Sequence, residues 1–365
     1  MSRLARLTPL ALAVAAVLAA PMAAAVESDP ILARAAKRTP TPPWGAGDEL
    51  GMGNTQGPGT WVRCAWHLSL PRAKSYELSY IRSNTMPKSP FSGPYIQTFK
   101  PTGGIPFSAH AFNGEQLEAG AEPGSQGTQI DALGHFAFLP EPWKMTPPFP
   151  SDTARYYGGF TQADVKPTPD SPLMKLGMEK AVPIITSAIL LDAKAHVGKG
   201  QPMQAGQTVT AQHIREMLEA QGLAGRGILP GDVVYIRTGW GDYWQDPDTD
   251  KFYYTKAPGL SYDAAQYLGS KNVVAVGLDT PFVDPVPEGM MQGKAPPAEG
   301  TPPGLPFAVH HYLITQMGIH HIEHANLAAI ADDKVWTSCT MVLALREKGA
   351  SGSGVRPVAI GVPGQ

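Results

Sequence analysis

The stretch "GTQIDALGHF" at residues 127–136 places three chemically useful side chains close together. Gln129 and Asp131 are separated by one residue, and His135 follows Asp131 after a further three. In an extended chain, residues separated by an even number of positions leave the same face of the strand. We therefore expect a strand that runs into a turn, with the three side chains directed toward one point. A metal ion, a reacting substrate, or only a hydrogen-bonded turn can account for such an arrangement.

Strand-like and helix-like segments alternate through the second half of the chain, whereas the first half reads mostly as strands and loops. Runs rich in Val, Ile, Thr and Tyr predict strands at residues 75–83, 182–193, 231–239, 272–279, 335–347 and 356–362. Periodic apolar residues predict helices at residues 210–222, 261–271 and 307–317. Thr210 is placed to cap the first of these helices. The mixture predicts an α/β fold with a mixed sheet.

The first 25 residues have the layout of a secretory signal peptide. Arg3 and Arg6 precede an apolar run at residues 7–20, and small residues follow at 23–25. We expect cleavage near residue 25, a periplasmic or secreted protein, and no membrane attachment after cleavage. An uncleaved membrane anchor is the alternative. The remaining residues, 26–365, are expected to form a single domain, because the long loops rich in glycine and proline resemble lids more than linkers.

Charge and cysteine content narrow the class of protein further. The formal net charge is −2 and no long basic run occurs, so nucleic acid is not an expected partner. Cys64 and Cys339 are the only cysteines, and an oxidising compartment would permit a disulfide between them. Neither cysteine belongs to a CxxC motif, and Cys339 lies in an apolar strand-like run. The sequence therefore favours a buried, unbridged Cys339.

Half of the histidines gather near one carboxylate. Within fifteen residues, the histidines around Glu323 are His310, His311, His320, His321 and His324. Such a cluster is typical of a metal site, and a solvated histidine-rich turn is the simpler alternative. Residues 320–324 also fit the H-x-x-E-H pattern of inverted zinc peptidases, but that site needs a helix, which this segment disfavours. We instead expect a helix, a turn and a short extended segment that brings His311 and Glu323 toward the sheet.

Taken together, these segments resemble the putative cyclase family, metal-dependent hydrolases that include bacterial kynurenine formamidase and isatin hydrolase. "GTQIDALGHF" is similar to the family signature H-x-G-T-H-x-D-x-P-x-H, in the GTQ-x-DAL-x-H form of its longer members. Further similar blocks are "GDELGMGN" (47–54), "GDVVYIRTGW" (231–240), "VVAVGLDTP" (273–281), "HYLITQMGIHHIEHANL" (311–327) and "SGSGVRPVAI" (351–360). The resemblance covers the chain from about residue 45 almost to its end. It implies a barrel-like mixed β-sheet with flanking helices, and a homo-oligomer.

The resemblance also implies a set of metal ligands. Asp131, His311 and Glu323 match the family's ligands, whereas Ser125 and Gln129 stand where the family signature has histidines. Gln129 can still bind a metal through its amide oxygen. The implied cofactor is a divalent metal ion, either Mn²⁺ or Zn²⁺. Mg²⁺ is a further alternative, because amide and carboxylate oxygens are hard ligands.

The activity expected from these residues is hydrolysis of a small-molecule substrate. An exported enzyme of this kind would open an amide, cyclic amide or lactone bond with metal-activated water, and His135 would be the general base. Trp240, Tyr243 and Trp244 follow a predicted strand and are candidates for the wall of the substrate site, with core packing as the alternative. The alternative functions are a metal-poor small-molecule binding protein, a metal-dependent lyase or dehydratase, and the zinc peptidase.

Overall fold

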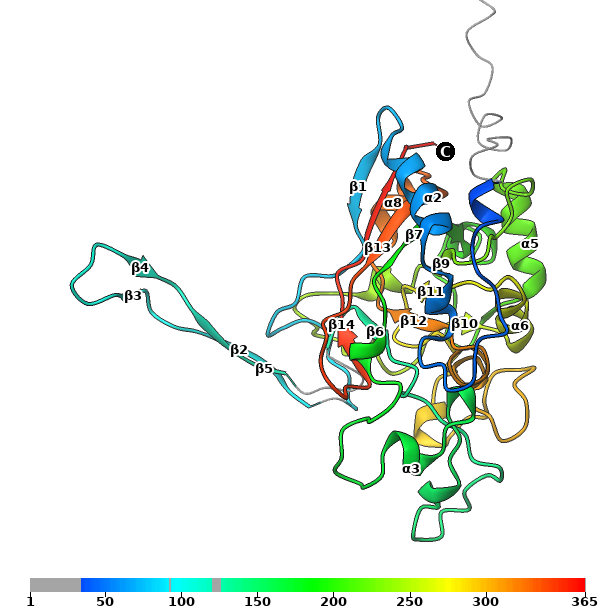
Figure 1. Ribbon diagram of the computed structural model, residues 1–365, viewed down its shortest axis with the longest axis horizontal. Helices are drawn as coiled ribbons and strands as arrows, with labels where there is room; N and C mark the ends of the chain where they lie inside the picture. Colours follow the sequence, from blue (N-terminus) through cyan, green and yellow to red (C-terminus); the bar gives the residue numbers. More distant parts are fainter. Residues whose placement is uncertain (1–33, 92, 120–125, 365) are drawn as a thin grey trace, which may run out of the picture.

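A nine-stranded mixed sheet forms the centre of the computed structural model, which describes residues 34–91, 93–119 and 126–364. The strand order is β1-β15-β13-β7-β9-β11-β12-β6-β14. The sheet curls into a half-barrel and helices pack around it (Figure 1). The predicted α/β fold with a barrel-like mixed sheet is therefore confirmed. The predicted signal peptide lies outside the described residues.

The central sheet is parallel in its middle and antiparallel toward both ends. Its strands are β1 (Lys74–Glu77), β6 (Gln129–Asp131), β7 (Ile184–Asp192), β9 (Val233–Arg237), β11 (Ala275–Leu278), β12 (His320–Glu323), β13 (Thr337–Val342), β14 (Gly352–Gly354) and β15 (Val358–Gly361). The neighbours β7, β9, β11 and β12 are parallel, and almost all of their residues are buried. Burial on both faces explains the mainly apolar sequences of β7, β9 and β11. All six runs predicted as strands are confirmed, although each is shorter in the structure.

Helices predicted from apolar periodicity are also found. The α-helices with described bounds are α2 (Pro58–Leu68), α3 (Gln162–Val165), α4 (Ala193–His196), α5 (Ala211–Ala220), α6 (Tyr262–Ser270), α7 (Ala308–His310) and α8 (Ala328–Asp332). The short 3₁₀ segments are η2 (Gly51–Thr55), η3 (Ser151–Thr153), η4 (Tyr157–Gly159), η5 (Met178–Lys180), η6 (Trp240–Tyr243) and η7 (Met290–Gln292). Thr210 caps α5 as predicted, because its hydroxyl accepts a hydrogen bond from the amide of His213. The third predicted helix is α7 continued by a π-helical turn, η8 (His311–Gln316).

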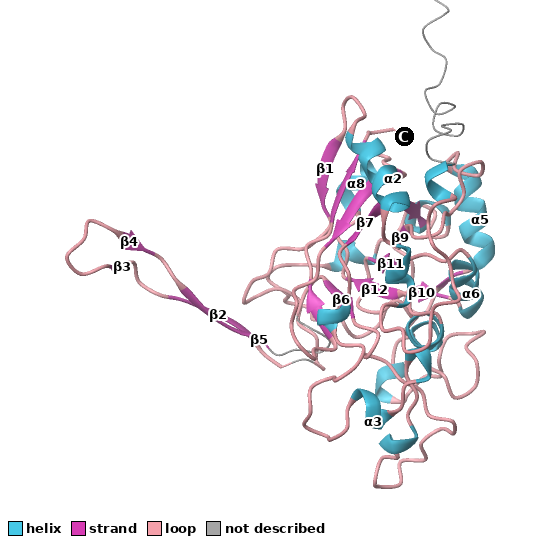
Figure 2. Cartoon of the chain, in the orientation of Figure 1, coloured by secondary structure: helices cyan, strands magenta, loops and turns pink. Residues whose placement is uncertain are grey.

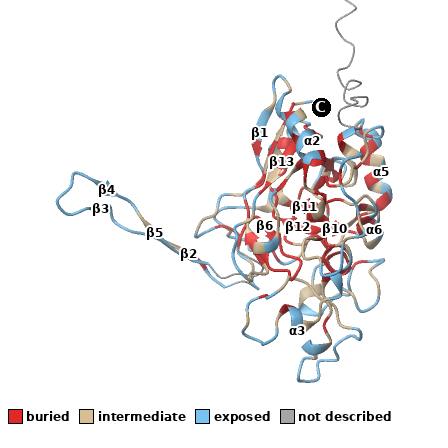
Figure 3. Cartoon of the chain, in the orientation of Figure 1, coloured by how far each residue is buried: buried red, intermediate tan, exposed pale blue. Residues whose placement is uncertain are grey.

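The hydrophobic core lies on the central sheet, and its residues come from along most of the described chain, from Met52 to Ala359. Buried residues concentrate on the sheet and on the inner faces of α5 and α6 (Figure 3). Helix α2 packs across β7, β13 and β15, and α5 packs against both α6 and β7. Each fully buried Val, Leu or Ile side chain contributes roughly 1.5–3 kcal/mol through removal from water. The sheet therefore provides a rigid support for the side chains that project from its strands.

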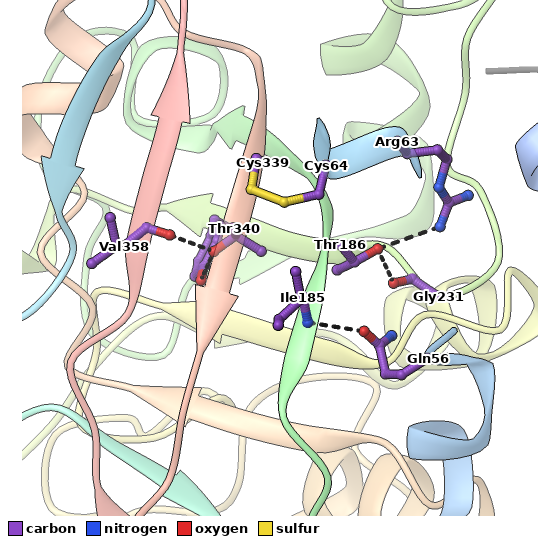
Figure 4. Close-up of a disulfide and its surroundings, with 10 residues drawn as sticks. Gln56, Arg63, Cys64, Ile185, Thr186, Gly231, Cys339, Thr340 and Val358 are labelled. Carbon is purple, nitrogen blue, oxygen red and sulfur yellow. Dashed lines mark hydrogen bonds between the residues drawn. A yellow bond between two sulfur atoms is a disulfide. The ribbon is translucent and has the colours of Figure 1, made fainter. Parts of the chain in front are cut away.

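A disulfide joins Cys64 of α2 to Cys339 of β13, with a Cα–Cα distance of 4.2 Å (Figure 4). The prediction of an unbridged Cys339 is wrong. The sequence did not predict α2, and this helix is the element that carries Cys64 across the sheet to β13. Arg63 anchors the same helix, since its guanidinium donates to the carbonyl of Pro230 at 2.7 Å and to the hydroxyl of Thr186 at 3.4 Å.

A long hairpin leaves the body between β1 and β6 (Figure 2). It consists of β2 (Tyr95–Phe99) paired with β5 (Glu115–Ala119), and of β3 (Gly103–Gly104) paired with β4 (Ala111–Phe112). One further small ladder joins β8 (Thr208–Val209) to β10 (Gly259–Leu260). Within the described ranges, none of the helices is long and apolar enough to cross a membrane.

Candidate metal centre

Four buried side chains converge where β6 and β12 lie side by side. Asp131 comes from β6, His321 and Glu323 from β12, and His310 from the end of α7. Each offers one nitrogen or oxygen atom, and these atoms all lie within 4.8 Å of one another. His321 and Glu323 are two residues apart on a strand, so their side chains leave the same face. Because β12 is a strand and not a helix, the H-x-x-E-H zinc peptidase is excluded.

The spacing of these atoms suits a shared cation. Nε2 of His310 lies 3.7 Å from Oδ2 of Asp131 and 3.5 Å from Oε1 of Glu323. Nδ1 of His321 lies 4.0 Å from Oδ2 of Asp131. These distances are too long for good hydrogen bonds. They are close to the separation of about 3.4 Å between two ligand atoms around a tetrahedral zinc ion.

Three atoms of the cluster lack hydrogen-bond partners among the described residues. Oδ2 of Asp131 and both ring nitrogens of His321 are buried without a hydrogen bond to any described residue. Leaving a buried polar atom unsatisfied costs about 1–3 kcal/mol, so several such atoms at one point indicate a ligand-binding site. Two imidazoles and two carboxylates form a donor set that binds Zn²⁺ and Mn²⁺. The residues therefore fit a divalent metal ion.

Burial makes the charged forms of these side chains unfavourable when no cation is present. It raises the pKa of Asp131 to about 7, and it raises the pKa of Glu323 well above its usual range, with the nearby Asp131 carboxylate as the second cause. Burial also lowers the pKa of His321 well below its usual range. A neutral imidazole has the free lone pair that metal binding requires.

Asp284 orients one of the histidines. Its carboxylate accepts a hydrogen bond from Nδ1 of His310 at 2.6 Å and from the backbone amides of Val309 and His310 at 2.7 and 3.0 Å. A carboxylate only accepts, so Nδ1 carries the proton and Nε2 is left free toward Asp131 and Glu323. Carboxylate–histidine pairs of this kind commonly fix metal ligands. No spacing in the sequence links Asp284 to His310, which is why sequence analysis did not identify it.

The two predicted carboxylates, Asp131 and Glu323, meet in this cluster, whereas the predicted ligand His311 does not. Nε2 of His311 accepts a hydrogen bond from the side-chain amide of Gln316 at 2.8 Å, and the His311 ring lies edge-on to Phe138. His310 occupies the place expected for His311. Successive residues on a helix point about 100° apart, so the choice between adjacent histidines depends on a helical register that the sequence does not reveal. The histidine cluster itself was the signal for His310 and His321.

Gln129 lies beside the cluster and contacts both carboxylates. Its amide nitrogen donates to Oε2 of Glu323 at 3.0 Å and lies 3.4 Å from Oδ1 of Asp131. In this orientation Gln129 hydrogen-bonds to the candidate ligands and is not itself one of them. His320 links β12 to β6, since its Nδ1 donates a hydrogen bond to the backbone carbonyl of Asp131 at 2.7 Å. Ser125 lies outside the described residues.

His135 and an apolar pocket border the cluster. His135 is half-buried, and its ring centre lies 6.1 Å from that of His310. Burial, with the nearby His310 as the second cause, lowers the pKa of His135 to about 3, so the ring is neutral at pH 7. The pocket has a volume of about 530 Å³ and is lined mainly by Phe136, Phe138, Leu139, Trp143, Leu305 and Phe307. The rings of Phe136 and Phe307 contact the His310 ring, at centre distances of 5.2 and 5.9 Å.

The three aromatic residues predicted to line the substrate site lie elsewhere. Trp240 is buried and packs against Tyr243 and Phe252. Trp244 stacks on Tyr80 with ring centres 4.4 Å apart, and both line a separate surface groove. None of the predicted three lines the pocket beside His310.

Comparison with known proteins agrees with this fold. The family model described as putative cyclase matches residues 52–285. The crystal structure of a novel cyclase is 22% identical and has a TM-score of 0.68, with 87% of this chain and 97% of that chain covered. Isatin hydrolase A from Ralstonia solanacearum is 18% identical and has a TM-score of 0.51, with 81% and 95% covered.

Isatin hydrolase A from Labrenzia aggregata, solved with benzyl benzoate, is 14% identical and has a TM-score of 0.51, with 80% and 94% of the two chains covered. At such identities, the likeness to these structures shows a shared fold. No curated protein matches the chain at a significant level. The family model spans more than half of the chain, which confirms the resemblance inferred from the sequence motifs. The protein belongs to the putative cyclase family.

Proposed function

We propose that the protein is a metal-dependent hydrolase that opens an amide, a cyclic amide or a lactone bond. The observation that carries this proposal is a set of buried atoms of Asp131 and His321 that have no hydrogen-bond partner among the described residues. These atoms lie within 4.8 Å of ligand atoms of His310 and Glu323. A divalent ion held there would polarise a substrate carbonyl and make water at the site easier to deprotonate. Mn²⁺ and Zn²⁺ are the ions that this donor set suits best.

Neighbouring side chains have distinct tasks in this proposal. His135 lies next to the cluster and is partly accessible, so a ring nitrogen is placed to take a proton from water and return it to the leaving group. Asp284 keeps the proton of His310 on Nδ1, so that Nε2 faces the cluster. Phe136 and Phe307 pack against the His310 ring and limit the access of bulk water.

The pocket beside the cluster supports a compact, apolar substrate. Its volume falls in the range of about 300–1,000 Å³ that is usual for small-molecule sites, and its lining is mostly aromatic and aliphatic. Isatin hydrolases share the fold, so isatin and other ring-fused cyclic amides are the first substrates to test, followed by aryl formamides and lactones. The Cys64–Cys339 bridge agrees with an oxidising compartment and supports export to the periplasm or beyond.

Replacement of the proposed base tests this assignment. We expect His135→Ala to lower kcat by a factor of about 10²–10⁴ and to leave the metal content unchanged, because His135 lies outside the ligand cluster. Turnover and metal content would be measured on the same preparation, with His110→Ala as the control, since His110 lies exposed on the hairpin. Normal turnover by His135→Ala would show that His135 is not the general base. A metal-loaded wild type that is inactive on all three bond classes would refute the hydrolase proposal.

A further inference from the structure

The apolar pocket beside the metal-ligand cluster is walled by two loops that lie far apart in the sequence. One loop lines it with residues between 136 and 143, the other with residues 303–307, and His311 of η8 completes the wall. The loops approach each other closely, since a Cβ atom on Gly304 would lie 3.1 Å from Cγ of Pro142. A substrate that reaches the cluster through this pocket therefore contacts both loops.

None of the described residues that line this pocket has a charged side chain. Apart from His311, the lining consists of alanine, glycine, leucine, proline, phenylalanine and tryptophan residues. Glu141 and Lys144 belong to the first loop, but neither of them lines the pocket. A charged group that leaves water for such a lining loses its hydration without gaining a partner, which is unfavourable. The side chains of the two loops therefore disfavour an ionised substituent.

His311 is the one polar side chain among the described lining residues, and its ring is uncharged. Its Nε2 accepts a hydrogen bond from the side-chain amide of Gln316 at 2.8 Å. A nitrogen that accepts a hydrogen bond carries no proton, whereas both ring nitrogens of a positively charged histidine carry one. His311 therefore offers an ionised substrate no opposite charge.

Trp143 continues the apolar lining to a part of the pocket that meets solvent, where its side chain is 41% exposed. Its Nε1 donates a hydrogen bond to the carbonyl of Thr146 at 3.0 Å, and its ring lies edge-on to that of Phe149 with centres 5.3 Å apart. Beside the cluster, two phenylalanine rings contact the ring of His310. The lining is thus apolar both at the cluster and at the solvent, and aromatic surface of this kind favours contact with uncharged rings.

We propose that this pocket takes an uncharged substrate and discriminates against amides and lactones that carry a carboxylate or an ammonium group, as amino-acid derivatives do. The inference rests on the proposed hydrolase function and narrows the substrate class of the same site. Neutral cyclic amides, aryl formamides and lactones are substrates, and their ionised analogues of equal size are excluded by the lining of the two loops.

Pairs of substrates that differ in charge but not in size test this selectivity. Isatin, formanilide and dihydrocoumarin would each be compared as the ring carboxamide and the ring carboxylate, so that all three proposed bond classes are represented. The wild type should hydrolyse the carboxamide with a kcat/KM at least about 100-fold higher than that of the carboxylate, because only the carboxylate loses the hydration of a full charge. The difference should lie mainly in KM, since it arises on binding.

A positive charge introduced into the pocket should reverse part of this preference. Leu305 lines the pocket and is half-buried, so Leu305→Arg offers a partner for a substrate carboxylate. This variant should raise the kcat/KM of the carboxylate relative to the carboxamide by at least about tenfold. Met145→Arg is the matched control, because Met145 is 77% exposed and does not line the pocket. It adds the same charge and should keep the wild-type preference. Metal content and circular dichroism would confirm that both variants are folded.

Two results would overturn the proposal while leaving the hydrolase function in place. One is a wild type that hydrolyses the carboxylate, or the corresponding aminomethyl analogue, as well as the carboxamide. The other is an equal preference of Leu305→Arg and Met145→Arg, since the pocket lining would then not set the selectivity. Inactivity of the metal-loaded wild type on every pair would instead refute the hydrolase function, and this inference with it.

Discussion

The buried side chain of His67 makes the stability of the folded protein depend on pH. His67 on α2 is only 2% exposed, and burial, with the charges of Arg226 and Arg63 as further causes, lowers its pKa to about 3. In the unfolded chain its pKa returns to about 6.5. Between about pH 3 and pH 6.5, His67 therefore binds a proton in the unfolded state but not in the folded state. The stability from neutral His67 is complete above about pH 6.5 and is lost as the pH falls toward 3.

We predict that His67→Gln weakens this loss of stability in acid. Between pH 7 and pH 4.5, the free energy of unfolding of the wild type should fall by about 2–3 kcal/mol more than that of the variant, because glutamine does not titrate. Urea denaturation at both pH values measures the difference. The control is His110→Gln, where an exposed histidine is replaced and the pH response should match the wild type. Identical pH responses of His67→Gln and the wild type would contradict the prediction.

At the scale of elements, the junction between η8 and β12 positions two of the cluster residues. Gly318 ends the turn at φ +65°, and its carbonyl accepts a hydrogen bond from the amide of Met52 at 2.8 Å. A Cβ atom on Gly318 would lie 2.6 Å from the ring of Tyr157 and 2.7 Å from the Cα of Gly51. The close backbone approach and the left-handed conformation both require glycine here.

Gly318→Ala should therefore destabilise the protein by about 2–4 kcal/mol, the sum of the conformational cost and the clash with rigid backbone. Gly222→Ala is a matched control, because Gly222 has φ +72° and nothing lies within 4 Å of its added Cβ. That control should cost only about 1 kcal/mol. Chemical denaturation of both variants measures these costs. Equal losses of stability would show that the contact at Gly318 is unimportant.

The elements near this junction also show how far sequence reasoning reaches. The helical segment at 307–317 was predicted from apolar periodicity, whereas β6 and the short strand β12 were predicted from the spacing of polar residues along the chain; both are local signals. The exchange of His310 for His311, and the role of Asp284, depend on helical register and on loop placement. Those features arise from tertiary packing, which a local pattern does not encode. Helix α2 and the hairpin formed by β2 to β5 were missed for a related reason, since a short amphipathic helix and a solvated hairpin carry weak patterns.

At the scale of the whole molecule, the disulfide links segments that are 275 residues apart. Cross-linking such distant positions restricts the unfolded chain, and we predict that replacing both Cys64 and Cys339 by Ala lowers the free energy of unfolding by about 2–5 kcal/mol. Thermal denaturation with and without reductant measures the effect. Reductant should lower the Tm of the wild type and leave the double variant unchanged. Two titratable thiols in wild type denatured without reductant would contradict the bridge.

The proposed function depends on the cluster of Asp131, His310, His321 and Glu323, so the metal content of the protein tests it most directly. The untagged chain, purified without chelator, would be analysed by mass spectrometry of its metals beside Asp131→Ala, His310→Ala and His311→Ala. We predict about one Mn or Zn ion per chain in the wild type and in His311→Ala, and little in the other two variants. The account would be contradicted if His311→Ala lost the metal while His310→Ala kept it. A wild type that binds no metal even after addition of Mn²⁺ or Zn²⁺ would contradict it as well.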